Sequence, residues 1–140
     1  MKIVLDTNCL LVVLPLHSQY RCIWEAFRQR KFSLCYTTEI LQEYEELLSR
    51  YYPADFTGLT IEILLKSPNI FQVIPFYKWN LIIADPDDNK FVDCALNADA
   101  DYIVTNDKHF NVLKDINFPF VKVIDIKTFK DIVQQKNEKN

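Results

Sequence analysis

Three apolar runs in this chain each lead into an acidic residue. Residues 3–5 precede Asp6, residues 82–84 precede Asp85, and residues 103–106 lead to Asp107. A buried strand that ends on a carboxylate places this charge at one edge of its sheet. Several such charges repel one another unless a cation lies among them. We therefore expect the functional site at the edge where these strands end.

The rest of the chain alternates strands with helices. Apolar periodicity predicts strands or extended segments over residues 2–13, 32–36, 69–75, 100–105 and 121–126, the first of them broken at residues 6–8, where a turn could start a helix. It predicts helices over residues 18–30, 40–51, 56–66, 89–98, 108–113 and 128–135. Continuous apolar strands between helices are typical of a parallel sheet that is buried on both faces. We predict a single-domain α/β/α sandwich with a central parallel sheet, which binds its ligands beyond the carboxyl ends of the strands.

Length and composition limit the domain organisation. The 140 residues suit one domain, which we place at residues 1–133, followed by a polar, disordered tail over residues 134–140. No apolar run has the length of a membrane span, and Asp6 interrupts the first run too early for a secretory signal. We therefore expect a cytoplasmic protein.

Cysteine, glycine and charge exclude several classes of site. The four cysteines are widely spaced in apolar stretches, which predicts reduced, buried thiols rather than disulfides or a zinc site. The only glycine, Gly58, excludes glycine-rich phosphate loops. The net charge of −3 lacks the basic excess of most nucleic-acid-binding proteins, but an acidic site that holds divalent cations is locally neutralised.

Further acids belong to helices or helix starts. Glu43 borders the apolar stripe of the helix over residues 40–51, from where its carboxylate can reach the edge of the sheet. Asp85, Asp87 and Asp88 crowd one helix start, where one or two acids suffice as caps and a third adds repulsion. Asp93 lies about 140° around the helix from Asp88, so we expect it to be exposed or in a supporting role.

Each of these acids, taken alone, could be an ordinary helix cap or part of a solvated helix face. Their common position at one edge favours a bound cation instead. Oxygen ligands without histidine or cysteine select Mg²⁺ or Mn²⁺. Such ions activate water and neutralise the charge of a reacting phosphoryl group, especially as a pair about 4 Å apart.

The acidic motifs, in this order and spacing, resemble the PIN domain. The motifs are I-V-L-D-T-N at residues 3–8, Glu43 within residues 40–44, D-P-D-D-N-K-F at residues 85–91 with Ala95, and A-D-Y-I-V-T-N-D at residues 100–107. The likeness runs from Lys2 to about Phe129 and is greatest to the VapC-like toxins of prokaryotic toxin–antitoxin pairs. It implies an α/β/α sandwich with Mg²⁺- or Mn²⁺-dependent ribonuclease activity.

The resemblance also implies roles for individual residues. Asp6, Glu43, Asp88 and Asp107 match the acidic quartet of the family. Asp88 is preferred to Asp85 and Asp87 because the third acid of the family stands seven residues before a helix alanine, here Ala95. Asn8 and Thr105 match the polar residues that support the quartet, whereas Asn106 stands where many relatives have glycine or arginine.

On this basis we expect a metal-dependent endoribonuclease that leaves a 5′-phosphate and a 3′-hydroxyl. Asp6, Asp88 and Asp107 would hold a first ion, and Glu43 would hold a second ion or orient the attacking water. Lys90 and Lys108 are candidates to pair with RNA phosphates, or are simply solvated lysines.

A toxin would also have a cognate antitoxin and could form a homodimer. Four aromatic residues of the first half could line either interface, although we favour the core for most of them: Trp24, Phe27, Tyr51 and Tyr52.

Other functions remain as alternatives. A PIN-like nuclease could process RNA outside a toxin pair, or a PIN-like module could bind partners without cleaving. A receiver domain would need an acidic pair after the first strand and a lysine after the last, and a haloacid-dehalogenase-type phosphatase would need D-x-D at residues 6–8. The sequence D-T-N fits neither of these.

Overall fold

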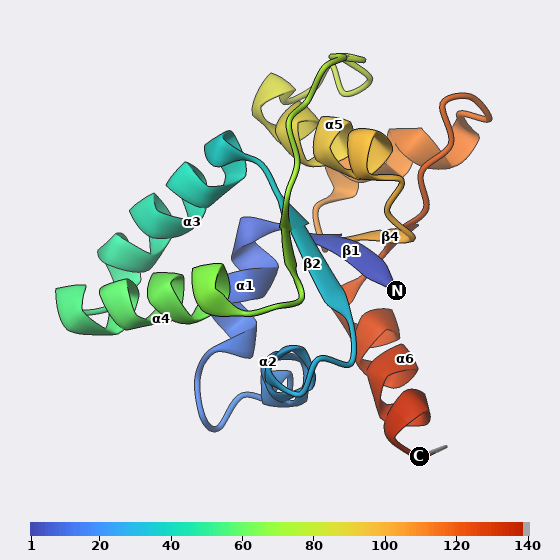
Figure 1. The fold of residues 1–140 in the computed structure, drawn as a ribbon. Coiled ribbons are helices and arrows are strands. Elements are labelled where there is room, and N and C mark those ends of the chain that lie inside the picture. Colours follow the sequence, from blue (N-terminus) through green and yellow to red (C-terminus); the bar gives the residue numbers. More distant parts are fainter. Residues whose placement is uncertain (139–140) are drawn as a thin grey trace.

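The computed structural model describes residues 1–138 and contains one five-stranded sheet, in which neighbouring strands are all parallel (Figure 1). The spatial order of the strands is β3-β2-β1-β4-β5. Their bounds are β1 Lys2–Leu5, β2 Ser33–Tyr36, β3 Ile70–Gln72, β4 Tyr102–Val104 and β5 Val123–Ile124. The helices are α1 Thr7–Val13, α2 Arg21–Arg28, α3 Thr38–Tyr51, α4 Ala54–Lys66, α5 Asn89–Ala98 and α6 Ile126–Glu138, with 3-10 helices η1 Pro86–Asp88 and η2 Lys108–Asp115.

Helices cover both faces of the sheet. Helix α5 packs across β1, β2 and β4 on one face, and α2 and α6 pack against each other on the other (Figure 1). Helices α3 and α4 form a pair that extends away from the sheet on the side of β2. This arrangement confirms the predicted α/β/α fold with a central parallel sheet.

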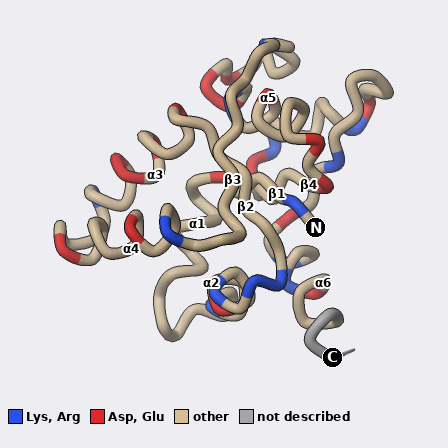
Figure 2. Tube along the Cα trace, viewed as in Figure 1, with Lys and Arg blue, Asp and Glu red and all other residues tan. Residues whose placement is uncertain are grey.

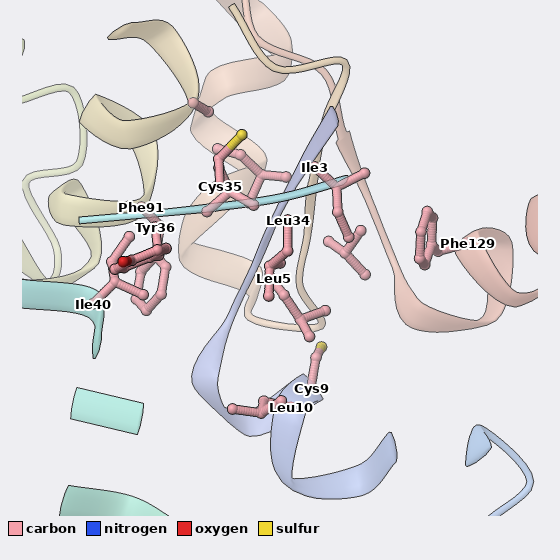
Figure 3. Close-up of a cluster of buried hydrophobic side chains, with 14 of the residues drawn as sticks. Ile3, Leu5, Cys9, Leu10, Leu34, Cys35, Tyr36, Ile40, Phe91 and Phe129 are labelled. Carbon is pink, nitrogen blue, oxygen red and sulfur yellow. The ribbon is translucent and has the colours of Figure 1, made fainter. Parts of the chain in front are cut away.

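The core lies between the central strands and the helices that flank them. Figure 3 shows Ile3 and Leu5 of β1 and Leu34 of β2 between side chains of the surrounding helices, among them Leu10 and Phe129. All five side chains are almost completely buried. Because β1 is the middle strand and its apolar residues face both layers, the position of its carboxyl end is well determined by packing.

The chain turns from strand to helix at Asp6. Strand β1 ends at Leu5 and helix α1 begins at Thr7. The helix start considered at residues 6–8 is therefore present, and the strand predicted over residues 2–13 ends at that turn. The Asp6 carbonyl accepts the first helical hydrogen bond, from the amide of Leu10 at 3.1 Å. An apolar segment of this length suits a buried helix as well as a buried strand, which is why periodicity alone did not separate them.

The apolar run at residues 82–84 is not a strand either. In the structure, both backbone polar groups of Ile82 bond to the side chain of Asn89, with its amide donating to Oδ1 and its carbonyl accepting from Nδ2, each at 2.8 Å. Ile82 is buried and both of these backbone groups are satisfied by Asn89, while residues 73–84 have no regular secondary structure. Asp85 therefore reaches the site from a loop and not from a strand end.

Several smaller predictions can be compared with the structure. All four cysteines are free, and Cys9, Cys35 and Cys94 are buried. Helix α6 continues to Glu138, through residues 134–138 of the segment for which we predicted a disordered tail, and residues 139–140 lie outside the described residues. No helix within residues 1–138 is long and apolar enough to cross a bilayer.

The four aromatic residues considered for an interface fall into two groups. Trp24 and Phe27 are buried in the core, in contact through their rings, as favoured from the sequence. Tyr52 is half-buried and stacks on Phe56, and Tyr51 is 69% exposed. Only Tyr51 is therefore fully available at the surface.

Candidate functional site

Asp6 lies at the centre of the acidic edge, directly after the middle strand. Its backbone amide donates to the Val104 carbonyl at 3.0 Å, which continues the pairing of β1 with β4. Its side chain is buried, and its Oδ2 accepts a hydrogen bond from the Thr105 hydroxyl at 2.7 Å. Burial raises the pKa of Asp6, the Thr105 bond opposes this, and the charges of Glu43 and Asp107 raise it further. The ionised form of Asp6 is thus less stable here than it would be in water.

Asp107 follows the neighbouring strand β4 and is tied to the same threonine. Its backbone amide donates to the Thr105 hydroxyl at 3.0 Å, so one hydroxyl links the two acids. Its Oδ1 accepts from the amide of His109 at 2.9 Å, which caps η2. The capping role considered from the sequence is therefore real, and the same carboxylate still contributes charge at the position of Asp6.

Glu43 reaches the site from α3, which is anchored to the end of β1. The buried hydroxyl of Tyr44 donates to the Leu5 carbonyl, next to Asp6. Glu43 Oε2 accepts a hydrogen bond from the Thr7 hydroxyl, and Glu43 Oε1 lies 2.9 Å from the ammonium nitrogen of Lys90. Both carboxylate oxygens of Glu43 therefore have partners from the chain itself.

Asp88 ends η1 and faces Asp107 and His109. Its Oδ2 lies 3.3 Å from His109 Nδ1, and the same nitrogen lies 3.4 Å from Asp107 Oδ1. The pKa of Asp88 is raised to about 6, first by burial and then by the charge of Asp107, against the hydrogen bond of His109. Asp85 and Asp6 raise it further. A bound cation would relieve this repulsion.

The tightest set of possible metal donors is Asp85, Asp88 and His109, whose donor atoms lie within 4.8 Å of one another. Within residues 1–138 no other group of three or more acids, histidines or cysteines is that compact, and this includes the predicted quartet of Asp6, Glu43, Asp88 and Asp107. The quartet does gather at one edge, because Asp6 is influenced by Glu43 and Asp107, and Asp88 by Asp107 and Asp6.

His109 was not among the residues that the sequence predicted for the site. Its place two residues after Asp107 was the available signal. The Asp85 carboxylate also caps η1, because its Oδ1 accepts a hydrogen bond from the Asp87 amide at 3.2 Å.

The three residues expected to support the quartet differ in their roles. Thr105 joins two acids as described, and Asn8 is exposed in a hollow of about 280 Å³ lined by Asp6, Asn106 and Asp107. The Asn106 side chain accepts a hydrogen bond from the Ile126 amide at 3.1 Å and so holds the start of α6. Thr105 and Asn8 therefore lie at the acids, and Asn106 connects them to the helix layer.

The two candidate lysines are placed differently. Lys90 is paired with Glu43, and its side chain is only 14% exposed. Lys108 is exposed and lines a second hollow of about 360 Å³ with Asn111, Lys114 and Thr128. The basic residues between α2 and β2 lie at the end of β2 opposite to the acidic edge (Figure 2).

Asp93 differs from the expectation of an exposed or supporting residue at the acids. It is buried, and its Oδ1 accepts a hydrogen bond from the Trp79 amide at 3.0 Å. The reason is the irregular segment 73–84, which packs over α5 and covers this side of the helix. Asp93 thus anchors that segment.

The donor set fits a divalent cation. Asp85, Asp88 and His109 offer two carboxylates and one imidazole within 4.8 Å of one another, and Asp107 Oδ1 lies 3.4 Å from His109 Nδ1. Neighbouring carboxylates add to the effect of burial in raising the pKa values of Asp6 and Asp88, and a cation would offset that repulsion. Carboxylate oxygens suit Mg²⁺ and Mn²⁺, and an imidazole nitrogen favours Mn²⁺ over Mg²⁺.

Comparisons with known proteins concern the family and the fold. The family model of the PIN domain matches residues 2–109. Among solved structures, a chain of the crystal structure of VapBC2 from Rickettsia felis bound to a DNA fragment from their promoter is similar, with a TM-score of 0.63 and 18% identity, over 89% of this chain and 98% of that chain. At this identity the likeness concerns the fold. No curated protein matches the chain in sequence.

Proposed function

The chain belongs to the PIN domain family, and from this premise we propose that it is a metal-dependent endoribonuclease. PIN domains are generally nucleases, so hydrolysis of a phosphodiester is the reaction class of the family. The observation that carries the proposal is the gathering of Asp6, Asp88 and Asp107 at one edge. The pKa values of Asp6 and Asp88 are both raised, first by burial and further by neighbouring carboxylates, of which Asp107 acts on both. Such repulsion is what a divalent ion at this edge would remove.

In the proposal, Asp6, Asp88 and Asp107 hold the ion, and His109 and Asp85 lie within reach of it. A bound Mg²⁺ or Mn²⁺ supplies charge neutralisation at the phosphate and makes a water more acidic. Thr105 holds the Asp6 carboxylate in place, and Asn8 offers an exposed amide in the adjoining hollow. Lys108 is the candidate to pair with a backbone phosphate of the RNA. The products would carry a 5′-phosphate and a 3′-hydroxyl.

The cellular role proposed is that of a toxin in a toxin–antitoxin pair. Support comes from the fold neighbour, whose structure is that of VapBC2 with promoter DNA. A cognate antitoxin and a homodimer are the partners that this role implies. The free cysteines fit a reducing cytoplasm as the place of action. A PIN nuclease that processes RNA outside a toxin pair, or a PIN module that binds without cleaving, are the competing roles.

The activity is tested with Asp6→Asn, which keeps the shape of the side chain and removes its charge. We expect this change to lower cleavage of total RNA in the presence of Mn²⁺ by at least about 100-fold, because a ligand to the ion is lost. The fold should be retained, since burial raises the pKa of Asp6 and an uncharged amide avoids that cost. The 5′-phosphate ends are counted by ligation-based sequencing, and circular dichroism checks the fold.

The matched control is Asp131→Asn, an exposed carboxylate on α6. It should cleave like the wild type. If Asp6→Asn also cleaves at the wild-type rate, the site assignment is wrong. Co-purification of the chain with the product of a neighbouring gene would separate a toxin from an RNA-processing nuclease.

A further inference from the structure

The ammonium group of Lys90 lies inside the acidic site. A surface lysine usually extends its charge into water, yet the Lys90 side chain is only 14% exposed. Its Nζ lies 2.9 Å from Glu43 Oε1 and donates to the Asp87 carbonyl at 2.8 Å. It also lies 5.3 Å from the centroid of the Phe91 ring, which is within the range of a cation–π contact. Lys90 is thus a fixed cation at the acids.

Each carboxylate oxygen of Glu43 already has a partner from the chain. One of its oxygens takes Lys90, and the other takes the hydroxyl of Thr7, the residue directly after Asp6. A metal ion at Glu43 would have to displace the ammonium group of Lys90 or bind close to it. Either requirement disfavours a dication there, because the two cations would repel each other at short range.

Within residues 1–138, no lysine or arginine forms an ion pair with the other half of the site, Asp88 and Asp107. These two acids face each other across His109, whose Nδ1 lies 3.3 Å from Asp88 Oδ2 and 3.4 Å from Asp107 Oδ1. A divalent ion is therefore favoured at Asp88 and Asp107 and disfavoured at Glu43.

We propose that the ammonium group of Lys90 takes the position at Glu43 that a second divalent ion would otherwise occupy, so that the site binds a single metal ion. This inference rests on the proposed function, since it assumes a metal ion at Asp6, Asp88 and Asp107. It also assigns Glu43 to orienting rather than to metal binding. Lys90 acts as a positioning residue, because it works through Glu43.

A direct contact of Lys90 with RNA phosphate is the competing role. Two protein oxygens and one aromatic ring already surround its ammonium group, and little of the side chain is exposed. Lys108, which is exposed two residues before Phe110, is better placed to meet a phosphate. The structure therefore favours the role of Lys90 as a fixed cation.

The test counts bound Mn²⁺ in the full chain by isothermal titration calorimetry and by electron paramagnetic resonance. The wild type should bind one ion per chain. Lys90→Met removes the charge but keeps an unbranched side chain on Phe91, and it should bind two. Lys90→Arg keeps the charge and should bind one. Lys108→Met removes an exposed charge beside Asp107 and should also bind one. In Lys90→Met/Glu43→Gln the second ion should be lost again.

Three results would overturn the inference: two ions of similar affinity in the wild type, one ion in Lys90→Met, or a second ion in Lys108→Met. A Lys90→Met variant that binds RNA more weakly in chelator, with an unchanged ion count, would assign Lys90 to the phosphate instead. Absence of any bound Mn²⁺ in the wild type would contradict the proposed function itself, which keeps the two failures distinct. Thermal melts of each variant confirm that it is folded before ions are counted.

Discussion

Single residues at the acidic edge differ in how well the fold compensates their charge. Asp6 is almost fully buried but receives a hydrogen bond from Thr105, whereas Asp88 has His109 as its one side-chain partner and is pushed to a pKa of about 6. In the metal-free protein, ionised Asp88 is therefore destabilised by burial and by its acidic neighbours. A cation bound there would offset this cost.

Asp88→Asn should stabilise the metal-free protein, in a way that depends on pH. The ordinary pKa of Asp88 is 3.8 and its pKa in the folded protein is about 6, so the folded state binds more protons between these values. The stability that neutral Asp88 allows is complete below about pH 4 and is lost as the pH rises through 6. At pH 7.5 we expect the variant to gain about 1 kcal/mol, less than the full shift implies because the site is partly open to water.

Urea unfolding in chelator at pH 4 and pH 7.5 measures this difference. The gain should be small at pH 4, where Asp88 is neutral in the folded state and only partly ionised in the unfolded state. Asp131→Asn should show no such pH dependence. Equal gains at both pH values would mean that charge at Asp88 is not the cause.

At the scale of elements, the apolar periodicity of the sequence predicted most strands and helices correctly. Strands β2 and β4 and helices α3 and α5 lie close to their expected ranges, because their apolar patterns match their burial. The run at residues 82–84 was misjudged because a sequence pattern does not reveal which groups satisfy a backbone. Here one asparagine side chain does what a neighbouring strand would do.

Asn89→Ala should loosen the segment that leads into the site. The change removes both hydrogen bonds to the buried backbone of Ile82, and leaving those groups unsatisfied should cost about 2–4 kcal/mol. Because Asn89 directly follows Asp88, the variant should also bind Mn²⁺ roughly tenfold more weakly. Urea unfolding and calorimetry measure the two effects.

Asn111→Ala, at an exposed position in η2, serves as the control and should change neither quantity. A loss of stability in Asn89→Ala with unchanged Mn²⁺ affinity would show that the segment does not position Asp88.

The site itself was only partly predictable. Strand ends place Asp6 and Asp107 by topology, so their common edge follows from the sequence pattern. The partners of Lys90 and the position of His109 depend on side-chain directions and on the path of an irregular loop, which spacing along the chain does not determine. For the same reason Asp93 was expected to be exposed or in a supporting role, whereas it is buried and accepts a hydrogen bond from the Trp79 amide.

At the scale of the whole molecule, metal binding should stabilise the fold. The acids come from β1, α3, the loop before α5 and the end of β4, so they converge only in the folded chain. An ion that binds only the folded state adds about 2.7 kcal/mol at a free concentration of 100 times its Kd. We expect Mn²⁺ at that concentration to raise the free energy of unfolding of the wild type by this amount, measured by urea unfolding.

Asp6→Asn should lose most of this Mn²⁺-dependent gain, and Asp131→Asn should keep it. A gain of the same size in Asp6→Asn would place the ion elsewhere on the molecule.

The strand order determines when the acidic edge can form during synthesis of the chain. Asp6 and Asp107 become neighbours because β4 pairs with β1, although the strands are far apart in sequence. At about 5–20 residues per second, a ribosome needs on the order of 5–20 s between the codons of these two acids. Throughout that interval the growing polypeptide lacks Asp107, and with it part of the acidic edge. Under the proposed function, the unfinished chain would therefore be unable to cut RNA, its own messenger included.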